Sequence, residues 1–341
     1  MRALVLGGTG LISQAVVRQM IALDNEVFIY NRGRTSADLP AVAGHIVAER
    51  ADVAEYREDL RRLNLDCVID MVGYTRAEAE ALVSACSGIV PQVVYCSTTD
   101  IYVKGRGPYP VNESSPRGAR PSFNYAVGKV QSEEVLEAAA GSGDFALTII
   151  RPAQTYGGPN HGPIHPLGHR GYNLLRACRG QKVILHGDGS SLWCAAFAPD
   201  VAAAFVAAAG NADAFGRDYI VAGSEVVTWR RYWEITCTAF GGPELDCLTI
   251  PTEVLRRAFG READALVENF QYNNVFDCTR AQVDLGFRYT IPLAEGFARV
   301  AAEFGERWLR EGELDEGSAY AEDYERCVTQ WPAVIDQLAR C

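Results

Sequence analysis

The chain has 341 residues, of which 48% are hydrophobic and 22% charged, so it is long enough for one large domain or two joined ones and is not a disordered chain. Its formal net charge of −11 argues against a protein that binds nucleic-acid phosphates, because such proteins are usually basic. The start "MRALVLGG" reaches a glycine turn too early for a signal peptide, and no apolar run approaches the roughly 20 residues of a membrane span. We therefore expect a cytoplasmic protein with no nucleic-acid or membrane partner.

Strands and helices alternate along the first half of the chain. Short apolar runs predict buried strands, and apolar positions at helical spacing predict helices between them. In chain order we expect strands at 3–8, 26–31, 44–52, 66–73, 92–97 and 145–153, and helices at 11–23, 76–86 and 125–140. This order predicts an α/β fold, a Rossmann-like doubly wound parallel sheet with helices on both faces.

The second half of the chain has a looser pattern. A loop rich in Gly, Pro and His is followed by a strand-like stretch, a helix that starts near Pro199 and Asp200, and one more strand at 218–223. We expect a first domain at 1–153, to which 191–223 return, and a smaller domain at 154–190 and 224–305. The charged segment 306–341 is expected to form C-terminal helices.

The ten cysteines have no CxxC spacing, and several lie inside apolar runs such as "DCVID" and "VVYCS". This pattern is typical of reduced, buried cysteines in a cytoplasmic protein. It also disfavours a structural zinc site, and we expect no bound metal.

A glycine turn, "GGTGLIS" at 7–13, joins the first strand to the first helix. Glycines at such a turn let the backbone approach a pyrophosphate, which then lies at the N-terminus of the helix. We expect contacts to a dinucleotide from Gly7, Thr9, Gly10, Leu11 and Ile12, which makes the first domain a dinucleotide-binding domain. A small serine replaces the third glycine of the usual pattern. The alternative is a tight turn without a ligand.

The second strand ends in "YNRGR", where NAD-binding proteins usually carry an acid for the adenosine ribose. Here Asn31, Arg32 and Arg34 are present, and arginine suits a 2′-phosphate, so NADP is favoured over NAD. Asp52, together with Val53 after the third strand, is placed to contact the adenine. The alternative for Asp52 is a helix N-cap, and both roles can hold at once.

A tyrosine and a lysine lie four residues apart in "NYAVGK", at the start of a predicted helix. This spacing puts Tyr125 and Lys129 on one face of the helix. An ammonium group beside a phenol stabilises the phenolate, so Tyr125 could exchange a proton near neutral pH.

The segments "GGTGLIS", "CSTTDIYV", "YAVGK", "IIRPAQTYGG" and "HGDGSSLWCAAFAPDVAAAF" occur in this order along nearly the whole chain. In this the chain resembles the extended short-chain dehydrogenase/reductase superfamily, the NAD-dependent epimerases and dehydratases. The resemblance implies a tightly bound NAD(P), with Thr98 and Tyr125 as catalytic residues and Lys129 orienting the nicotinamide ribose. It also implies a cofactor contact from Arg151 and a homodimer formed through the helix that carries Tyr125.

The strand end "STTD" separates branches of this family. The family's sugar 4,6-dehydratases carry two acids there, whereas this chain has Thr99 and Asp100, and the epimerases have no carboxylate. The resemblance implies that Asp100 can remove a C–H proton and that Thr99 contacts the substrate. The alternative is a solvated aspartate in a turn or a cap for the following loop.

Family members that use nucleotide sugars usually carry an arginine after "GDG" that binds the substrate diphosphate. In this chain Trp193 takes that place, and tryptophan cannot pair with a pyrophosphate but can stack on a sugar or a base. This favours a phosphate-free nucleoside or glycoside bound by the smaller domain, with His161 and His165 bonding its hydroxyls. The alternative for Trp193 is a core residue.

These features favour a redox-neutral dehydratase that oxidises a sugar unit, eliminates water and reduces the product again, as nucleoside 5′,6′-dehydratases of nucleoside-antibiotic biosynthesis do. An epimerase with the same oxidation step is the main alternative, and an NADPH-dependent carbonyl reductase is another. Some relatives with a similar "NRG" stretch bind RNA or sense cofactors. The net charge of −11 and the complete set of Thr98, Tyr125 and Lys129 count against that role.

Overall fold

The computed structural model describes residues 1–338, which divide into two compact units. Unit 1 consists of Met1–Thr155, Ala195–Gly223 and Phe276–Thr290. Unit 2 consists of Tyr156–Cys194, Ser224–Val275 and Ile291–Cys341, and its last three residues lie outside the described part. We describe each unit by itself.

A seven-stranded sheet forms the centre of unit 1, with strand order β11-β6-β5-β4-β1-β2-β3 and parallel pairing throughout. The strands are β1 (Arg2–Leu6), β2 (Glu26–Asn31), β3 (Gly44–Val47), β4 (Cys67–Asp70), β5 (Gln92–Cys96), β6 (Ala146–Pro152) and β11 (Arg217–Val221). Strand order reverses between β1 and β4, which is where open α/β sheets bind ligands at the carboxyl ends of their strands. The predicted Rossmann-like parallel sheet is confirmed.

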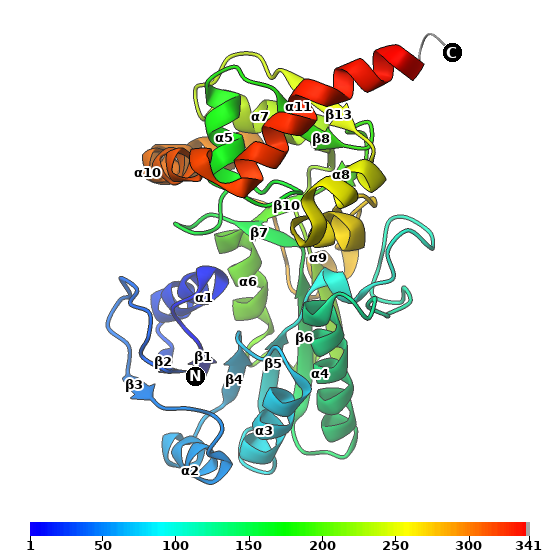
Figure 1. Ribbon diagram of the computed structural model, residues 1–341. Coiled ribbons are helices and arrows are strands. Elements are labelled where there is room, and N and C mark those ends of the chain that lie inside the picture. The colour runs from blue at the N-terminus through cyan, green and yellow to red at the C-terminus, as the bar shows by residue number, and fades with distance from the viewer. Residues whose placement is uncertain (339–341) are drawn as a thin grey trace. The chain divides into compact units, whose positions relative to one another are not determined.

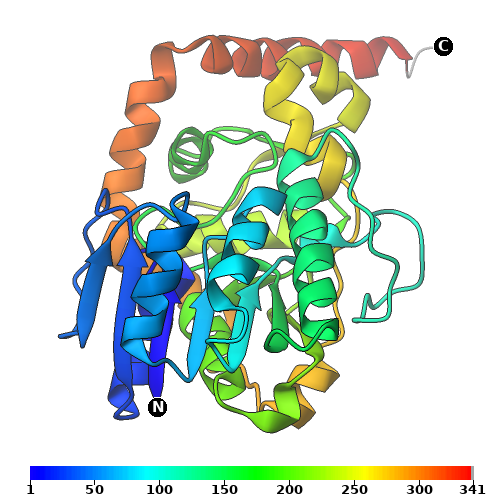
Figure 2. The same ribbon diagram turned by 90° about the horizontal axis from the view of Figure 1, so that it is seen from below.

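Helices cover both faces of this sheet (Figure 1). One face carries α1 (Leu11–Ala22) and α6 (Ala198–Ala208), and the other carries α2 (Val53–Leu63), α3 (Arg76–Cys86) and α4 (Asn124–Gly141), which lie side by side in Figure 2. The sequence did not predict α2, because its buried side is only Tyr56 and Leu60 within a run of charged residues. Capping residues fix where these helices begin. At the start of α3, for example, Thr75 and Glu78 form reciprocal side chain to backbone hydrogen bonds.

The core of unit 1 forms where the apolar strands meet α2, α3 and α4. Leu4, Val68 and Val93, on three neighbouring strands, are fully buried, as are Leu82 of α3 and Leu136 of α4. The nine cysteines of the described part are unpaired, and Cys341 lies outside it. Reduced thiols in the core fit the predicted use of cysteine as a small hydrophobic residue.

Shorter elements complete unit 1: η1 (Thr99–Ile101), β7 (Gln154–Tyr156), β10 (Ala195–Phe197), η2 (Ala212–Ala214) and α9 (Thr279–Asp284). Residues 276–290, which we expected in the smaller domain, belong to unit 1. The reason is that α9 lies against the sheet edge, where Arg280 forms an ion pair with Asp218 of β11.

Unit 2 contains two small sheets and several helices. Strand β8 (Val183–His186) pairs in parallel with β13 (Cys247–Ile250), and β9 (Leu192–Trp193) pairs with β12 (Val227–Thr228). The helices are α5 (Arg170–Cys178), α7 (Trp229–Ala239), α8 (Thr252–Phe259), η3 (Gly260–Ala263), η4 (Leu266–Phe270), α10 (Leu293–Leu314), η5 (Asp315–Gly317) and α11 (Ala319–Leu338). No helix in the described part combines the length and the apolar character that a membrane span needs.

Candidate active site

The glycine turn lies between β1 and α1, at the point where strand order reverses. Gly7 and Gly8 have φ values of 103° and 76°, which favour glycine. Added Cβ atoms would also lie 2.9 Å from Val72 and 2.8 Å from Ile29. Gly10 begins α1, and the buried Ser13 hydroxyl accepts a hydrogen bond from its backbone N–H at 2.9 Å. Ser13 thus closes the turn at the position where the usual pattern has glycine.

The end of β2 supports this turn. The Asn31 side chain donates to the Gly7 carbonyl at 2.8 Å and accepts from the Gly33 N–H at 2.8 Å. Arg34 forms an exposed ion pair with Glu49 at 3.1 Å, and Arg32 is exposed. Asn31 therefore has a structural role in the turn, and the cofactor contacts of Asn31, Arg32 and Arg34 stay predictions.

The predicted adenine contact lies at the start of α2. Asp52 is the N-cap of this helix, and its carboxylate accepts a hydrogen bond from the Glu55 N–H at 3.1 Å. Val53 is the first residue of the helix. The capping alternative for Asp52 is therefore present in the structure. The adenine contact stays a prediction.

The polar strand end after β5 begins a short helix. Ser97 extends the sheet, since its N–H donates to the Ile150 carbonyl at 2.8 Å. Thr98 is the N-cap of η1, and its hydroxyl accepts from the Asp100 N–H at 3.2 Å. Both threonines of this segment are nearly buried, with exposed fractions of 6% for Thr98 and 3% for Thr99. The segment is thus a buried, hydrogen-bonded continuation of the strand and not a solvated turn.

Tyr125, in the first turn of α4, meets this strand end. Its phenol forms a hydrogen bond with Thr98, which lowers its pKa, but burial and the nearby Cys96 and Asp100 raise its pKa well above the ordinary value. The ring as a whole is 40% exposed, so Tyr125 lies at the surface of unit 1 with its hydroxyl turned inward. In this structure the phenol is protonated at neutral pH and is ready to donate a proton.

Lys129 lies one turn further along α4, and only 1% of it is exposed. Its ammonium group donates to the carbonyls of Gly73 at 2.8 Å and Cys96 at 2.5 Å. It also lies over the rings of Tyr74 and Tyr95, at 4.9 and 4.8 Å from their centres. Burial lowers its pKa. The ammonium group therefore joins the ends of β4 and β5 beneath Tyr125.

Tyr74 was not predicted from the sequence. It follows β4, is 47% exposed, and its ring centre lies 6.3 Å from that of Tyr125. The site thus has a second aromatic ring beside the predicted catalytic phenol. Nothing in the sequence near Tyr74 signals this contact, because it arises where β4 and α4 meet.

Asp100 lies within η1, two residues after Thr98. Its carboxylate forms an ion pair with Lys104 at 3.6 Å, and 22% of the side chain is exposed. The Lys104 ammonium group also lies 5.4 Å above the ring of Phe276. The ion pair holds the Asp100 carboxylate beside the Thr98–Tyr125 pair, and its role as a base stays a prediction.

Arg151 has buried partners in a network of ion pairs. Its guanidinium donates to Glu133 at 2.9 and 2.8 Å and to the Tyr102 hydroxyl at 2.8 Å, and it pairs with Asp218. Only 1% of Arg151 is exposed. All three of its nitrogens therefore have protein partners, which gives Arg151 a structural role, and its cofactor contact stays a prediction.

Two predicted substrate residues are buried in unit 2. Trp193 is 3% exposed and packs against Trp229 and Phe270, with ring centres 4.8 and 5.0 Å away. His165 is also 3% exposed; its ring shares hydrogen bonds with the Ile184 carbonyl and the Leu167 N–H. This packing favours the core alternative for Trp193 and extends it to His165.

His161 differs from these two residues because it is exposed on a loop. Its backbone closes a small turn with Gly157 and Gly158 through hydrogen bonds of 2.9 Å. The substrate contacts of His161, His165, Trp193 and Thr99 stay predictions.

The residues of unit 1 fit a dinucleotide cofactor. The turn at Gly7 and Gly8 has no room for side chains, and it leads into the N-terminus of α1, the kind of place where proteins bind phosphate groups. Thr98, Tyr125 and Lys129 lie at the end of β5, on the same edge. Fold and site together define a nucleotide-binding α/β protein with a tyrosine-based site.

A family comparison narrows this class. Residues 3–222 match the family described as NAD dependent epimerase/dehydratase family. The chain therefore belongs to this family.

Three known proteins illustrate the range of similarity. The chain is 29% identical over 282 residues to 2'-dehydrokanamycin reductase of Streptomyces kanamyceticus, which covers 81% of this chain and 77% of that protein. It is 24% identical over 256 residues to chloroplast stem-loop binding protein of 41 kDa b of Arabidopsis thaliana, covering 71% of this chain and 64% of that protein. The structure of UDP-glucuronic acid 4-epimerase from Bacillus cereus in complex with NAD has a TM-score of 0.69 at 17% identity, covering 90% of this chain and 100% of that one. The last similarity concerns the fold alone.

Proposed function

We propose that the protein is an NAD(P)-dependent, redox-neutral dehydratase that acts on the sugar of a nucleoside or glycoside. The observation that carries this proposal is the hydrogen bond between Thr98 and Tyr125, with the Lys129 ammonium group and the Asp100 carboxylate beside it. A phenol and a carboxylate in one site can serve as separate proton carriers.

The residues have distinct tasks in this reaction. When bound, NAD(P) takes a hydride from the substrate carbon and later gives it back. Tyr125 accepts the hydroxyl proton of the substrate as the ketone forms, and Thr98 holds the same oxygen. Lys129 keeps the ends of β4 and β5 in place beneath Tyr125. The free protein has a protonated Tyr125, so the oxidation step requires that its pKa falls when cofactor and substrate bind.

Asp100 supplies the step that separates a dehydratase from a plain oxidoreductase. The ketone acidifies the neighbouring C–H, Asp100 removes that proton, and the hydroxyl on the next carbon leaves as water. The proton taken by Asp100 leaves with this hydroxyl, and Tyr125 returns its own proton to the oxygen as the ketone is reduced again, which restores the alcohol and leaves an alkene. The ion pair with Lys104 supports this role, because it fixes the carboxylate beside Thr98.

Unit 2 supports a substrate without phosphate groups. It contains a cavity of about 460 Å³ lined by hydroxyl, amide and acidic side chains, among them Asp188, Ser190, Gln271 and Asn273. No Lys or Arg of the described residues 1–338 lines this cavity, and burial lowers the pKa of the lining His186 to about 4, so the imidazole is neutral at pH 7. Such a wall can bind hydroxyls and amines, whereas a diphosphate would find no cation.

The main competing function is a carbonyl reductase. The similarity to 2'-dehydrokanamycin reductase favours it, since that protein's name describes reduction of a keto sugar. The protonated state of Tyr125 also suits a proton donor to a ketone. An epimerase would need only Thr98, Tyr125 and Lys129, and would leave the carboxylate of Asp100 without a task.

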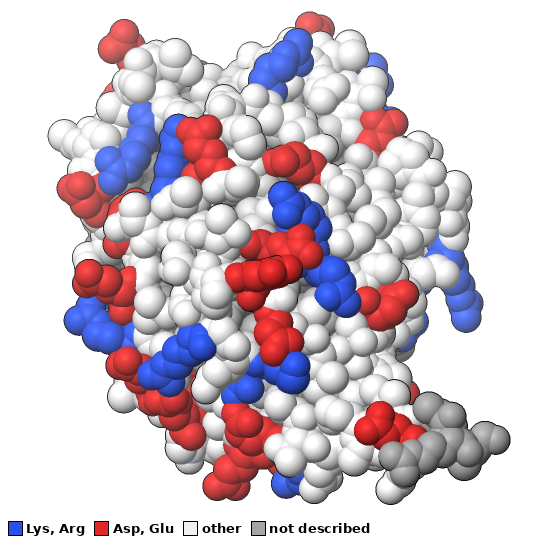
Figure 3. Space-filling model, turned by 90° about the horizontal axis from the view of Figure 1, so that it is seen from above, with Lys and Arg blue, Asp and Glu red and all other residues white. Residues whose placement is uncertain are grey.

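An RNA-binding role has less support. One relative is named a stem-loop binding protein, but the net charge of this chain is −11. Acidic and basic side chains are interspersed on the face shown in Figure 3, without a continuous basic patch. Phosphate backbones are bound by clustered Lys and Arg.

We also propose that NADP is preferred through Arg32, that the protein is a cytoplasmic homodimer, and that it binds no nucleic acid.

One experiment separates these functions. Purified protein with NAD(P)+ is incubated with psicofuranosyl adenine, and product mass and absorbance at 340 nm are recorded. A product lighter by about 18 Da, the mass of one water, with no net change in absorbance supports the dehydratase. A parallel incubation with NADPH and a 2′-keto aminoglycoside that consumes NADPH in a one-to-one ratio would point to the reductase instead.

A further inference from the structure

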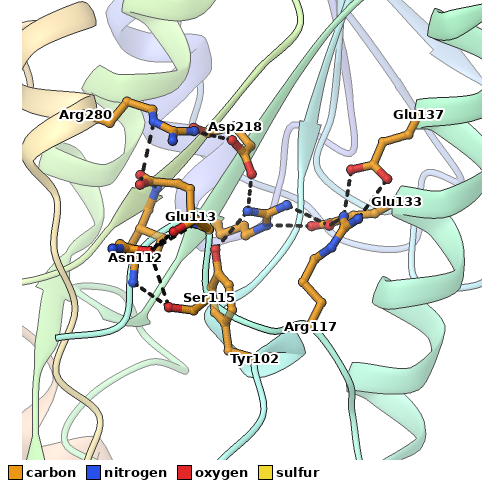
Figure 4. A network of polar contacts seen from close by, with 12 residues as sticks. Tyr102, Asn112, Glu113, Ser115, Arg117, Glu133, Glu137, Asp218 and Arg280 are labelled. Carbon is orange, nitrogen blue, oxygen red and sulfur yellow. Dashed lines mark hydrogen bonds and ion pairs between the residues drawn. The ribbon is translucent and has the colours of Figure 1, made fainter. Parts of the chain in front are cut away.

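Four residues form a closed ring between the two segments that carry the proposed catalytic residues. Tyr102 and Arg117 face each other in an antiparallel bridge. Arg117 donates to Glu133 at 2.6 Å, Arg151 donates to Glu133 at 2.9 and 2.8 Å, and Arg151 donates to the Tyr102 hydroxyl at 2.8 Å. Figure 4 shows Tyr102, Arg117 and Glu133 converging from different elements. We call this set the Tyr102 ring.

The Tyr102 ring joins the elements that hold the site. Tyr102 directly follows η1, which contains Asp100 and is capped by Thr98. Glu133 belongs to α4, one turn after Lys129 and two turns after Tyr125. The ring therefore connects η1 to α4 through a path that does not include the reacting groups.

The ring also lies at the base of the long loop, residues 104–115, that connects these elements. The Val103 N–H donates to the Pro116 carbonyl at 3.0 Å, and the Gly118 N–H donates to the Ile101 carbonyl at 2.7 Å. Residues 104–115 thus leave and return at one point. Without the ring, the chain between η1 and α4 would be a long loop, and such loops do not fix the distance between their ends.

Burial makes the ring sensitive to single substitutions. Glu133, Arg151 and Tyr102 are exposed by 0%, 1% and 2%. Outside the ring, Arg151 pairs with Asp218 of β11, and Asp218 pairs with Arg280 of α9 (Figure 4). Arg280 also forms an ion pair with Glu113 in the loop of residues 104–115. A buried charge that loses its partner cannot turn to water, so the ring members depend on one another.

We propose that the Tyr102 ring is a positioning device that holds Thr98 and Asp100 at the correct distance from Tyr125. This inference rests on the proposed function, since these groups need a fixed distance only if they act together on one substrate. Positioning errors of about 1 Å can lower turnover by about a hundredfold. The hydrogen bonds that close the ring join its own members and do not include Thr98, Asp100 or Tyr125.

The test uses Tyr102→Phe, which removes the hydroxyl that accepts a hydrogen bond from Arg151 and keeps the aromatic side chain in place. With NAD(P)+ bound, hydrogen exchange of amides in residues 99–103 and 117–127 should become about tenfold faster, while the rest of unit 1 is unchanged. With psicofuranosyl adenine or the 2′-keto aminoglycoside, whichever is converted, kcat should fall about tenfold with unchanged KM for the cofactor. The control Tyr219→Phe removes another buried tyrosine hydroxyl, which donates to Asp284 at 3.3 Å outside the ring, and should change neither measurement.

A second pair of variants tests the charge. Glu133→Gln breaks the ring, whereas Glu137→Gln removes a carboxylate that pairs with the same Arg117 at 2.6 Å but is 40% exposed and outside the ring. Only Glu133→Gln should speed exchange in both segments. If Glu133→Gln does not fold, Tyr102→Phe decides.

Two results would overturn the proposal. One is wild-type exchange in both segments of Tyr102→Phe. The other is faster exchange with wild-type kcat and an unchanged pH profile, which would make the ring purely structural. Failure of the proposed function is seen separately, as full activity of Tyr125→Phe or Thr98→Val. When neither compound is converted, the exchange data alone decide whether the ring holds the segments.

Discussion

Gly128 lies so close to the Tyr74 carbonyl that a Cβ atom at residue 128 would be 2.2 Å from its oxygen. The glycine of the "YAVGK" segment is therefore the point where α4 touches the backbone after β4. Tyr125 and Lys129 lie on either side of this point, and the Lys129 ammonium group reaches the carbonyl of Gly73 in the same segment. The contact sets how deeply the proposed catalytic helix sits on the sheet.

This contact predicts that Gly128→Ala is harmful. The new methyl group meets backbone atoms, so α4 must shift, at a cost of about 1–3 kcal/mol in the free energy of unfolding. The shift should also lower turnover by about a hundredfold, because Tyr125 moves with the helix. Urea unfolding and kcat measure the two effects.

Gly141→Ala is the matched control, since Gly141 ends the same helix and has nothing within 4 Å of an added Cβ. We expect it to be neutral or stabilising by up to about 1 kcal/mol, because alanine has the higher helix propensity. Equal effects of the two substitutions would show that helix propensity, and not the contact with Tyr74, decides the outcome.

Much of the fold could be predicted from the sequence because its signals are local. Apolar runs predicted all seven strands of the sheet, and the glycine turn marked the start of α1. The α2 helix escaped prediction because Tyr56 and Leu60 alone make its buried side. A local sequence pattern predicts an element from its buried apolar residues, and α2 has only two of them.

The site was less predictable because its contacts join distant segments. Tyr74 lies beside Tyr125 only because β4 and α4 pack together. The buried ion pairs of Arg151 leave no periodic pattern in the sequence, so its partners could not be predicted, and the cofactor contact that the resemblance implies stays a prediction. Trp193 was predicted to contact the substrate from its position after "GDG", and His165 from its loop, and neither position distinguishes a substrate contact from a buried aromatic residue.

The role of Asp100 can be separated from that of its ion pair. Asp100→Asn keeps the shape of the side chain but removes the base, and we expect at least about a hundredfold loss of dehydration with cofactor affinity unchanged. Lys104→Met removes the partner but keeps the carboxylate, which is 22% exposed, and should therefore lower turnover by less than Asp100→Asn does. Rates from mass spectrometry and cofactor titration check both variants. Near-normal turnover of Asp100→Asn would make it a turn residue.

The exposed Arg32 predicts a preference for NADP. A charge-assisted hydrogen bond to the 2′-phosphate contributes about 1.5–3 kcal/mol, so Arg32→Ala should weaken NADP binding about 10- to 100-fold and leave NAD binding unchanged. Calorimetric titration with each cofactor measures this. Arg62→Ala, an exposed arginine of α2 paired with Glu58, is the control and should change neither affinity. Parallel losses for NAD and NADP in Arg32→Ala would contradict a role at the 2′-phosphate.

The buried His165 predicts a loss of stability in mild acid. Burial lowers its pKa from 6.5 to about 3 in the folded protein, whereas the unfolded chain keeps the ordinary value. Between these two values the unfolded state binds a proton that the folded state does not, so stability falls as the pH drops from 6.5 towards 3. At pH 5 this amounts to about 2 kcal/mol for one group.

His165→Gln should remove this part of the pH dependence, because an amide can replace both ring hydrogen bonds without titrating. Urea unfolding at pH 7 and pH 5 should show a loss that is smaller by about 2 kcal/mol than in the wild type. His45→Gln, at an exposed histidine of β3, should leave the wild-type loss unchanged. Parallel losses in His165→Gln and the wild type would mean that burial does not lower the pKa of His165 in the folded protein.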